Sequence, residues 1–231
     1  MTHDRTQWEK RTLWENSARV PLVIRAPWLP ASVGARTSAP VELVDIYKTV
    51  CDVLGVPLPM QEEHPVEGTS LLPLLRSPRT GDMGGAWDKD VALTTYPRCP
   101  QTKLPAWKKN GCIHSTERTA FAYMGYSMLH RNATSGHTYR YTEWLKWNGT
   151  SLAPARASSS PPTESPASSM ESSQRPPLAT PKAVELYNHT APLPKGASEF
   201  DSFENVNLAA GAGSGLLRSL SDKLRGSFAI A

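Results

Sequence analysis

The sequence predicts an α/β protein, with a mixed first part and a small antiparallel sheet in the second part, on three observations. Apolar residues recur at spacings of three and four over residues 41–54, the pattern of a helix that lies on a sheet. From residue 90, short runs of β-branched and aromatic residues alternate with loop segments, as strands joined by loops do. A leucine-rich stretch at helical spacing follows residue 213. The chain is therefore divided into a mixed α/β unit over 1–89 and a strand-rich unit over 90–231.

Size and charge limit the classes of function. The chain has 231 residues, enough for one domain or one and a half. Its net charge of +4 is scattered, without a basic block, so we expect no nucleic-acid partner. No run of residues approaches the roughly 20 apolar positions of a membrane helix. The first five residues lack the apolar core of a signal peptide.

The three cysteines, Cys51, Cys99 and Cys112, are too few for a disulfide framework. Cys99 and Cys112 could pair across a loop, or both could be buried thiols, and the spacing leaves the two alternatives open. No Cys-x-x-Cys pair and no histidine cluster indicates a metal site. We therefore expect no metal ligands within this chain.

A tryptophan-rich stretch over residues 8–28 carries Lys10 about ten residues before an apolar run. In that run Leu22, Val23 and Ile24 have the uncharged, partly β-branched character of a buried strand. We expect Lys10 on a loop that a rigid sheet holds in place, where binding groups are common. Taken by residue type alone, Lys10 is interpreted as a solvated surface lysine.

Two helices are expected before residue 90. The first covers 41–54 and ends at a glycine. Asp45 on this helix is interpreted as a capping or solvated carboxylate rather than as a catalytic acid. The second helix is short, with Thr69 or Ser70 as its cap and Pro73 in its first turn.

The second part is predicted to hold strands over 91–97, 120–129, 138–147 and 184–187. In the third of these, Trp144 and Trp147 are expected to pack within the sheet rather than to form a sugar-binding platform. Residues 151–182 are rich in Ser, Pro, Ala and Thr and contain no aromatic residue. Such a segment cannot offset a backbone entropy of about 1–2 kcal/mol per residue, so we predict that it is disordered. The final amphipathic helix carries Leu216, Leu217, Leu220 and Leu224.

Several phrases occur in an order that is typical of one enzyme family. Trp8-Glu9-Lys10 comes first, then Arg-Val-Pro-Leu and two helical phrases. Tyr96-Pro97-Arg98 and three strand phrases follow. These phrases lie at residues 8–10, 19–22, 41–50, 68–75, 96–98, 123–127, 139–144 and 185–189. In this order the phrases resemble the sulfatase family, and within it the iduronate-2-sulfatase and choline-sulfatase branch. The resemblance covers nearly the whole chain, but only the C-terminal portion of the family's enzymes.

The resemblance implies the C-terminal part of a sulfatase fold. This part is a remnant of the large mixed α/β sheet followed by a small four-stranded antiparallel subdomain with a C-terminal helix. It implies hydrolysis of sulfate monoesters, on sulfated carbohydrates, and a secretory, lysosomal or extracellular location. Lys10 would contact the sulfate, as a compact ammonium suits a sulfate oxygen. Trp8, Lys10 and Arg98 would bind substrate.

The sequence departs from the family where the chemistry takes place. None of its cysteines lies in a Cys-x-Pro-x-Arg segment, whose cysteine becomes formylglycine. No acidic cluster offers calcium six to eight oxygen ligands. We therefore expect calcium and formylglycine only in the full family enzyme, and this chain to be a fragment that is inactive by itself. The iduronate enzymes use an arginine to bind the substrate carboxylate, and this chain has Leu129 at that position. His130 or Arg131 could take the role of that arginine.

Two other functional interpretations remain at this stage. One is a non-catalytic module that binds sulfated glycans through Lys10, Arg19 and the aromatic strands, and the other is a truncated product without function. For a sulfatase portion or a binding module, the partner is a sulfated small molecule or glycan. Asn-x-Thr sequons, which would fit a secreted or lysosomal product, occur at Asn132, Asn148 and Asn188.

Overall fold

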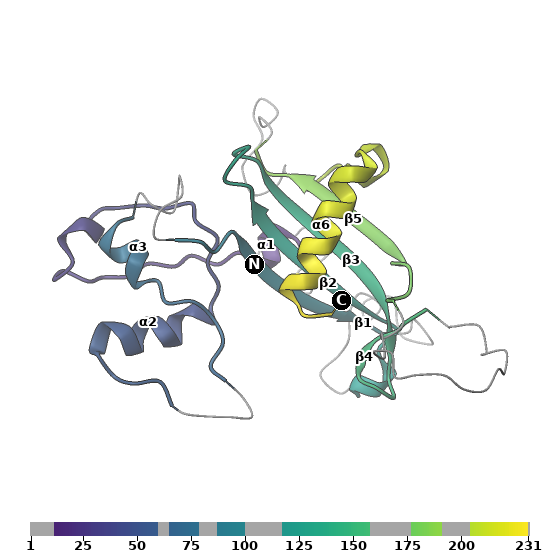
Figure 1. Cartoon of the computed structure of the whole chain (residues 1–231), viewed down its shortest axis with the longest axis horizontal. Coiled ribbons are helices and arrows are strands. Elements are labelled where there is room, and N and C mark those ends of the chain that lie inside the picture. The colour runs from purple at the N-terminus through teal and green to yellow at the C-terminus, as the bar shows by residue number, and fades with distance from the viewer. Residues whose placement is uncertain are drawn as a thin grey trace, which may run out of the picture.

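The computed structural model describes residues 12–59, 65–78, 87–99, 117–157, 177–190 and 204–230. Figure 1 shows one part made of short helices and loops, which includes α2 and α3, beside a curled sheet that one longer helix, α6, crosses. The structure is therefore α/β, with a small antiparallel sheet and a terminal helix, as the sequence predicts.

Four antiparallel strands form the sheet in the order β1-β2-β3-β5. They are β1 (Val91–Arg98), β2 (Tyr123–Arg131), β3 (Thr138–Asn148) and β5 (Ala183–Asn188), and a two-residue strand, β4 (Ala153–Pro154), pairs with the end of β3. All four predicted strands are confirmed. The second begins later than predicted because the chain is still in a 3₁₀ turn, η3, at Arg118–Ala120.

One face of the sheet is apolar and is covered by α6 (Ser214–Ser227). Leu220 and Leu224 of α6 are buried in a core to which the strands contribute Met128, Tyr141, Leu145 and Leu186. Burial of each leucine side chain stabilises the fold by about 1.5–3 kcal/mol. Leu220 and Leu224 of the predicted leucine stripe, with Leu217 packed beside them, therefore hold α6 on the sheet, whereas Leu216 is 38% exposed.

Two ion pairs fix the position of α6 on the strands. Arg225 donates from Nε to Oε2 of Glu143 at 3.0 Å, and its Nη2 lies 2.9 Å from the same oxygen. Glu143 also accepts the hydroxyl of Tyr141 at 2.9 Å. Burial and the neighbouring carboxylate raise the pKa of Tyr141, so this phenol remains a neutral donor. Two residues before Arg225, Lys223 pairs with Asp90 at 2.7 Å.

The described residues of the first part form four short helical segments: α1 (Glu15–Ala18), η1 (Pro30–Ser32), α2 (Asp45–Leu54) and α3 (Leu72–Arg76). A small core of Ala39, Leu71, Leu74 and Trp87 holds α3 in place. Pro73 lies in the first turn of α3, as predicted, and Ser70 accepts the N–H of Leu72 at 3.3 Å.

Asp45 begins α2 and is fully buried. Its carboxylate accepts the backbone N–H groups of Glu42 and Thr69, both at 2.7 Å, and the ammonium of Lys89 at 2.6 and 2.7 Å. The N-cap residue of α2 is Val44, and no side chain of the described residues caps the helix there, so the predicted capping role is not confirmed. Asp45 is a buried ion-pair partner of Lys89 rather than a solvated group.

The predicted strand at 22–24 is wrong. Leu22 and Ile24 are 39% and 38% exposed, Val23 is 90% exposed, and the segment is not extended into any ladder of the described residues. A β-branched run becomes a strand only where a neighbouring strand can take its backbone hydrogen bonds. The described strands pair with one another in the other part of the chain, so this run has no partner among them.

The apolar stripe of α2 is exposed as well. The helix itself is confirmed, but Leu43, Tyr47 and Leu54 are 64%, 53% and 68% exposed. The sheet on which this stripe was expected to lie is not found among the described residues. Together with the exposed run at 22–24, the stripe gives the first part an unusual amount of uncovered apolar surface.

The Ser- and Pro-rich insert is partly ordered. Its two ends run antiparallel, with a bridge between Arg156 and Leu178, and Leu178 is buried. The prediction of disorder is therefore wrong for residues 151–157 and 177–182, because a buried leucine and backbone hydrogen bonds tie both ends to the sheet. Residues 158–176 lie outside the described residues.

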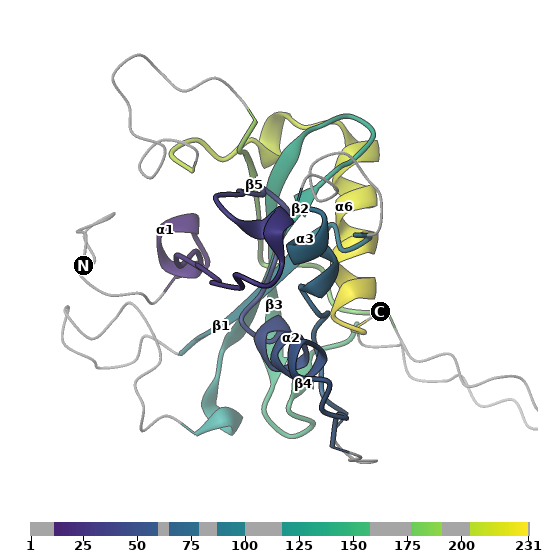
Figure 2. The same cartoon turned by 90° about the vertical axis from the view of Figure 1, so that its left-hand side faces the viewer.

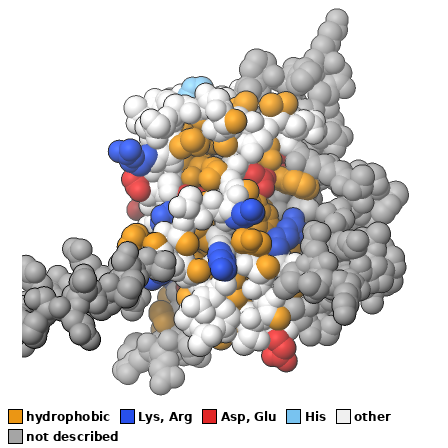
Figure 3. All heavy atoms as spheres, turned by 90° about the vertical axis from the view of Figure 1, so that its right-hand side faces the viewer, with side chains coloured by type: hydrophobic (Ala, Val, Ile, Leu, Met, Phe, Trp, Pro, Cys, Tyr) orange, Lys and Arg blue, Asp and Glu red, His pale blue; other side chains and the backbone are white. Residues whose placement is uncertain are grey.

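On the face that Figure 3 shows, Lys and Arg side chains lie among hydrophobic and other side chains rather than in one block. Within the ranges that the structure describes, no helix combines the length and apolar character needed to cross a membrane.

Candidate functional site

The second face of the sheet is polar and aromatic, and we call it the polar face. Strand alternation assigns residues to it: Gly125, Ser127 and Leu129 of β2 lie opposite Trp144, Thr142 and Arg140 of β3, with Tyr96 and Arg98 of β1 and Glu185 and Tyr187 of β5 in the same row. Figure 2 shows α1 and α6 on opposite sides of the sheet. The polar face is thus the one that meets the N-terminal segment.

Residues 12–18 pack on the polar face over the glycine of β2. A Cβ added to Gly125 would lie 2.5 Å from Cδ1 of Leu13 and 2.7 Å from Cζ3 of Trp144. Both distances are too short for a real contact, so only glycine fits at this point of the strand. The close approach lets Leu13, which is buried, seat the N-terminal segment beside Trp144.

Arg98 lies at the end of β1 against two aromatic rings of this face. Its guanidinium carbon is 4.9 Å from the ring centre of Trp144 and 5.7 Å from that of Tyr96, within the range of cation–π attraction. Burial lowers the pKa of Arg98, and the nearby Tyr96 and Glu185 oppose that shift. An arginine has so high an intrinsic pKa that it remains charged here.

Glu185 lies at the centre of this group and orients it. Its Oε1 accepts the indole N–H of Trp144 at 2.7 Å, and its Oε2 accepts the indole N–H of Trp14 at 3.1 Å and the hydroxyl of Tyr187 at 2.9 Å. Three donors hold one carboxylate, so both indole rings are fixed in position. We call Trp14, Tyr96, Arg98, Trp144 and Glu185 the Arg98 cluster.

The Arg98 cluster combines residues from four separate parts of the sequence. It presents a cation on flat rings, which is suited to an anionic group attached to a sugar or an aromatic ring. Trp144 is confirmed as a packing residue of the sheet, since its ring supports Arg98 and its N–H is bound. The carboxylate of Glu185 in this cluster is engaged by three hydrogen-bond donors.

A second group on the polar face is built around a buried arginine. Arg140 binds Oε2 of Glu15 through Nη2, and its Nε lies 2.7 Å from Oε1 of Glu204. The same Oε1 of Glu204 is 3.0 Å from Nε2 of His189, and its Oε2 accepts the backbone N–H of Glu15 at 2.7 Å. We call Glu15, Arg140, His189 and Glu204 the Arg140 cluster.

The Arg140 cluster is a structural lock rather than a metal site. Ligand atoms of Glu15, His189 and Glu204 lie within 4.8 Å of one another, but Arg140 already supplies the positive charge between the two carboxylates. Burial acts to raise the pKa of Glu204, yet the hydrogen bond to His189 and the charge of Arg140 outweigh it and lower the pKa. A lowered pKa keeps Glu204 ionised and joined to Arg140.

His130 and Arg131, the two candidates to replace the family's carboxylate-binding arginine, lie on opposite faces of the sheet because side chains alternate along β2. His130 lies on the α6 side, buried, with Nδ1 3.5 Å from Oδ2 of Asp90. Arg131 falls on the polar side and donates to Oγ of Ser38. It lies at the opposite end of β2 from the residue that pairs with Arg98, about 27 Å along the strand. Neither residue joins the Arg98 cluster.

The remaining predicted residues are only partly described. Trp8 and Lys10 lie outside the described residues, so Arg98 is the one member of the predicted substrate-binding set with a described position. Lys10 precedes by two residues the segment that packs on the polar face. Cys51 is a buried free thiol, whereas Cys99 is disulfide-bonded, to a partner outside the described residues.

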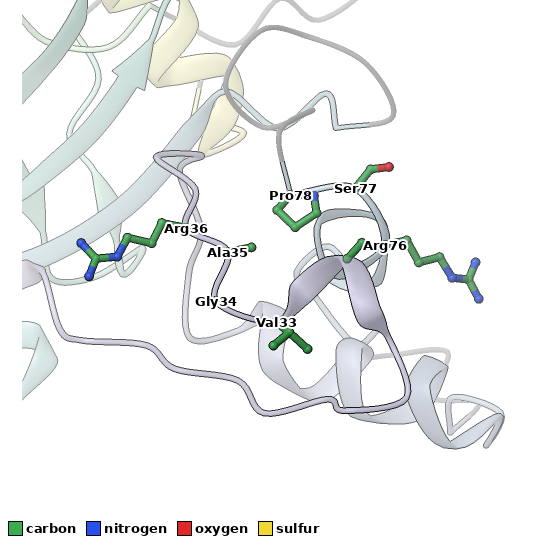
Figure 4. Close-up of a pocket in the computed structure, with 8 residues that line it drawn as sticks. Val33, Gly34, Ala35, Arg36, Arg76, Ser77 and Pro78 are labelled. Carbon is green, nitrogen blue, oxygen red and sulfur yellow. The ribbon is translucent and has the colours of Figure 1, made fainter.

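A depression in the first part offers less chemistry. It has a volume of about 590 Å³ and is lined by residues of two segments, 31–36 and 76–78. In Figure 4 the side chains of Arg36 and Arg76 point away from it in different directions. The depression is therefore lined mainly by small side chains and backbone, and no charged group is aimed into it.

Sequence reasoning identified Arg98 but not the residues that hold it. Trp14 and Glu185 are separated by 171 positions, and no local pattern connects them. The Arg140 cluster was also missed, although one signal was present. A charged residue stands between two tyrosines in β3, and a buried charge on the inner side of a strand requires a partner.

Comparison with known proteins points to the same family as the motifs. Human (Homo sapiens) arylsulfatase K is 44% identical over 68 residues, which cover 29% of this chain and 12% of that protein. Arylsulfatase K of the dog (Canis lupus familiaris) is 39% identical over 121 residues, 52% of this chain and 20% of that protein. The zebrafish (Danio rerio) protein is 42% identical over 69 residues, 30% of this chain and 12% of that protein.

These matches support membership of the sulfatase family. The matched stretches span about a fifth or less of the length of the relatives. No family model matches the chain, and no solved structure matches it. The finer assignment to the iduronate-2-sulfatase and choline-sulfatase branch stays a prediction.

Proposed function

We propose that the chain is the C-terminal portion of a sulfatase, a hydrolase of sulfate monoesters, and that the full enzyme acts on sulfated carbohydrates. The proposal is supported by the identity with arylsulfatase K and by the order of the motifs along the chain. In this portion the polar face forms one wall of the substrate pocket. The chain contributes to binding rather than to bond cleavage.

The observation that carries this role is the setting of Arg98. A guanidinium presents planar donors that match the oxygens of a sulfate or a carboxylate. Trp144 and Tyr96 fix its plane, and Glu185 fixes Trp144. Because the cation is held in place before a ligand arrives, less conformational entropy is lost on binding. Lys10 is proposed to contact the sulfate from the segment that precedes residue 12, and Trp8 of the same segment is proposed to bind substrate.

The described residues could not supply the formylglycine or hold the calcium ion that the family's reaction uses. Formylglycine would have to come from a Cys-x-Pro-x-Arg segment, which this sequence lacks. Calcium requires six to eight oxygen ligands, and the carboxylates of the Arg140 cluster are engaged by Arg140. We therefore propose that this chain by itself does not hydrolyse sulfate esters, and that nucleophile and metal belong to a catalytic portion of the enzyme.

Binding of a sulfated disaccharide to the purified chain tests the proposal. Arg98→Ala should weaken binding at least tenfold by calorimetry at physiological salt. The matched control is Arg218→Ala, which removes the same charge from an exposed position of α6 on the opposite face of the sheet. Equal affinity of the two variants would overturn the role of Arg98, whereas hydrolysis of an aryl sulfate by the purified chain would overturn the claim that it is inert.

A second candidate is a non-catalytic module that binds sulfated glycans. The observation in its favour is that residues of this chain make the contacts that hold Trp14 and Trp144 on Glu185 and place Arg98 over the ring of Trp144. The two functions differ in what they require. A binding module should show full affinity alone, whereas a portion of a sulfatase should gain affinity and turnover when a catalytic segment with Cys-x-Pro-x-Arg is co-expressed.

A further inference from the structure

Three Asn-x-Thr segments of this chain form the same local structure. In each, the side-chain oxygen of the asparagine accepts the backbone N–H of the threonine two residues later, at 2.9 Å for Asn132, 2.9 Å for Asn148 and 2.8 Å for Asn188. Each of these turns follows directly on a strand. Asn-x-Thr is the acceptor sequence of N-linked glycosylation, so the three turns are candidate modification sites.

Asn148 is distinguished from the other two by exposure. Its residue and Thr150 are both exposed, whereas Asn132 and Asn188 are half-buried. Asn188 also precedes the buried His189 of the Arg140 cluster, and the hydroxyl of Thr190 accepts the N–H of Thr138 at 2.6 Å. A bulky sugar therefore has open space at Asn148 and is restricted at Asn188.

Contacts with η3 hold the turn at Asn148 in place. A Cβ on Gly149 would lie 2.0 Å from the carbonyl oxygen of Thr119, so the backbone of this turn touches η3 directly. The indole of Trp147 donates to the carbonyl oxygen of Arg118 at 2.9 Å. These contacts keep the residue before and the residue after Asn148 against the protein, and the Asn148 side chain remains at the surface.

The two ends of the Asn148 amide have separate roles. Oδ1 accepts the N–H groups of Thr150 at 2.9 Å and Ser151 at 3.2 Å, and these bonds maintain the turn. Among the described residues Nδ2 donates no hydrogen bond. A glycan replaces one hydrogen of Nδ2 and leaves Oδ1 as it is. The folded turn is therefore the same with and without the sugar.

One further observation concerns the environment of the chain. Cys99 is disulfide-bonded, and disulfides persist in oxidising compartments such as the lumen of the endoplasmic reticulum. This is the compartment in which oligosaccharides are transferred to asparagine. The disulfide and the sequon therefore indicate the same environment by independent chemistry.

We propose that Asn148 is an N-glycosylation site. Nδ2 attacks the anomeric carbon of an oligosaccharide carried on a polyprenyl diphosphate. The new bond joins this nitrogen to the carbon, the bond from the carbon to the diphosphate oxygen breaks, and the lipid diphosphate leaves with the electron pair. Nδ2 loses one proton to a base. No oxidant or reductant takes part, and the inference is independent of the proposed sulfatase role.

The test is translation of the full chain into microsomes of the endoplasmic reticulum, behind a cleavable signal sequence. Products are treated with an N-glycosidase that converts each glycosylated asparagine to aspartate, and the peptide that contains residue 148 is identified by mass. The wild-type peptide should carry the mass increase of this conversion at Asn148. Thr150→Ala should lose one glycan on a gel, and Thr150→Ser, which keeps the acceptor sequence, should retain it.

The readout does not depend on folding of the variants, because transfer occurs on the nascent chain. Asn148→Asp keeps the oxygen that accepts the two N–H groups, and it should lose the glycan without a change in melting temperature of the secreted chain. An unmodified Asn148 peptide from the wild type would overturn the proposal. Identical gel mobility of the wild type and Thr150→Ala would overturn it too.

Discussion

Replacing Arg140 by methionine should destabilise the fold severely. The Arg140 side chain is 3% exposed, and it contacts two carboxylates, Glu15 and Glu204, that are 10% and 8% exposed. Methionine keeps much of the volume but removes the charge, so both buried carboxylates lose the guanidinium that lies between them. Among the described residues, Glu204 then keeps only His189 and the backbone N–H of Glu15. Within the same ranges Glu15 keeps only the half-exposed Arg19, at 3.5 Å. Breaking a buried ion pair in this way costs about 3–5 kcal/mol, a large part of the roughly 5–15 kcal/mol that stabilises a typical domain.

Urea denaturation followed by tryptophan fluorescence measures this loss. The matched control is Arg218→Met, the same replacement at an exposed position of α6, which should change the unfolding free energy by no more than about 0.5 kcal/mol. The variant Arg140→Met/Glu204→Gln should recover part of the stability, because one of the two buried carboxylate charges that lost the guanidinium is gone. A loss below about 1 kcal/mol for Arg140→Met would refute the view that this cluster locks the N-terminal segment to the sheet.

Three further predictions concern stability. Gly125→Ala should cost about 1–3 kcal/mol in denaturant unfolding, since a Cβ has no room against the N-terminal segment, whereas Gly215→Ala in α6, where the space is open, should cost nothing; equal effects would contradict the packing. The lowered pKa of His130, caused by burial, keeps its imidazole neutral in the folded state. Stability should therefore fall as pH drops below about 6.5, and His130→Gln should flatten melting temperature against pH in that window; an unchanged slope would contradict it. Arg225→Ala should lower the unfolding free energy by about 3 kcal/mol, because it leaves the carboxylate of Glu143 buried at 1% exposure, and a melt like that of the wild type would count against this ion pair.

The sheet and its covering helix could be predicted because their signals are local. Alternation along β3 and the leucine spacing of α6 each report which side of an element is buried. The strand predicted at 22–24 is wrong for the same reason. The strand propensity of a β-branched segment is a local property, and it is the same whether or not a partner strand is present. The exposed apolar stripe of α2 shows the same limit of local patterns. The spacing of apolar residues indicates that one face of a helix is to be covered, but it does not identify the element that covers it.

Only one residue of the candidate site, Arg98, could be predicted, because it lies in a sequence motif. Arg98 came from the phrase Tyr-Pro-Arg, but its supports, Trp14 and Glu185, come from the two ends of the chain. The Arg140 cluster joins residues that are 125 positions apart. Contacts of this kind depend on strand register and on how the N-terminal segment crosses the sheet, and no pattern within a short window contains that information.

The most direct test of a ligand-binding polar face is the response of the indole N–H signals of the ¹⁵N-labelled chain to a sulfated disaccharide, followed by NMR. The Trp144 and Trp14 signals, whose N–H groups are bound to Glu185, should shift in the wild type and stay unchanged in Arg98→Ala. A ligand-binding role for this face would be contradicted if those two signals did not move, or if they moved equally in both proteins.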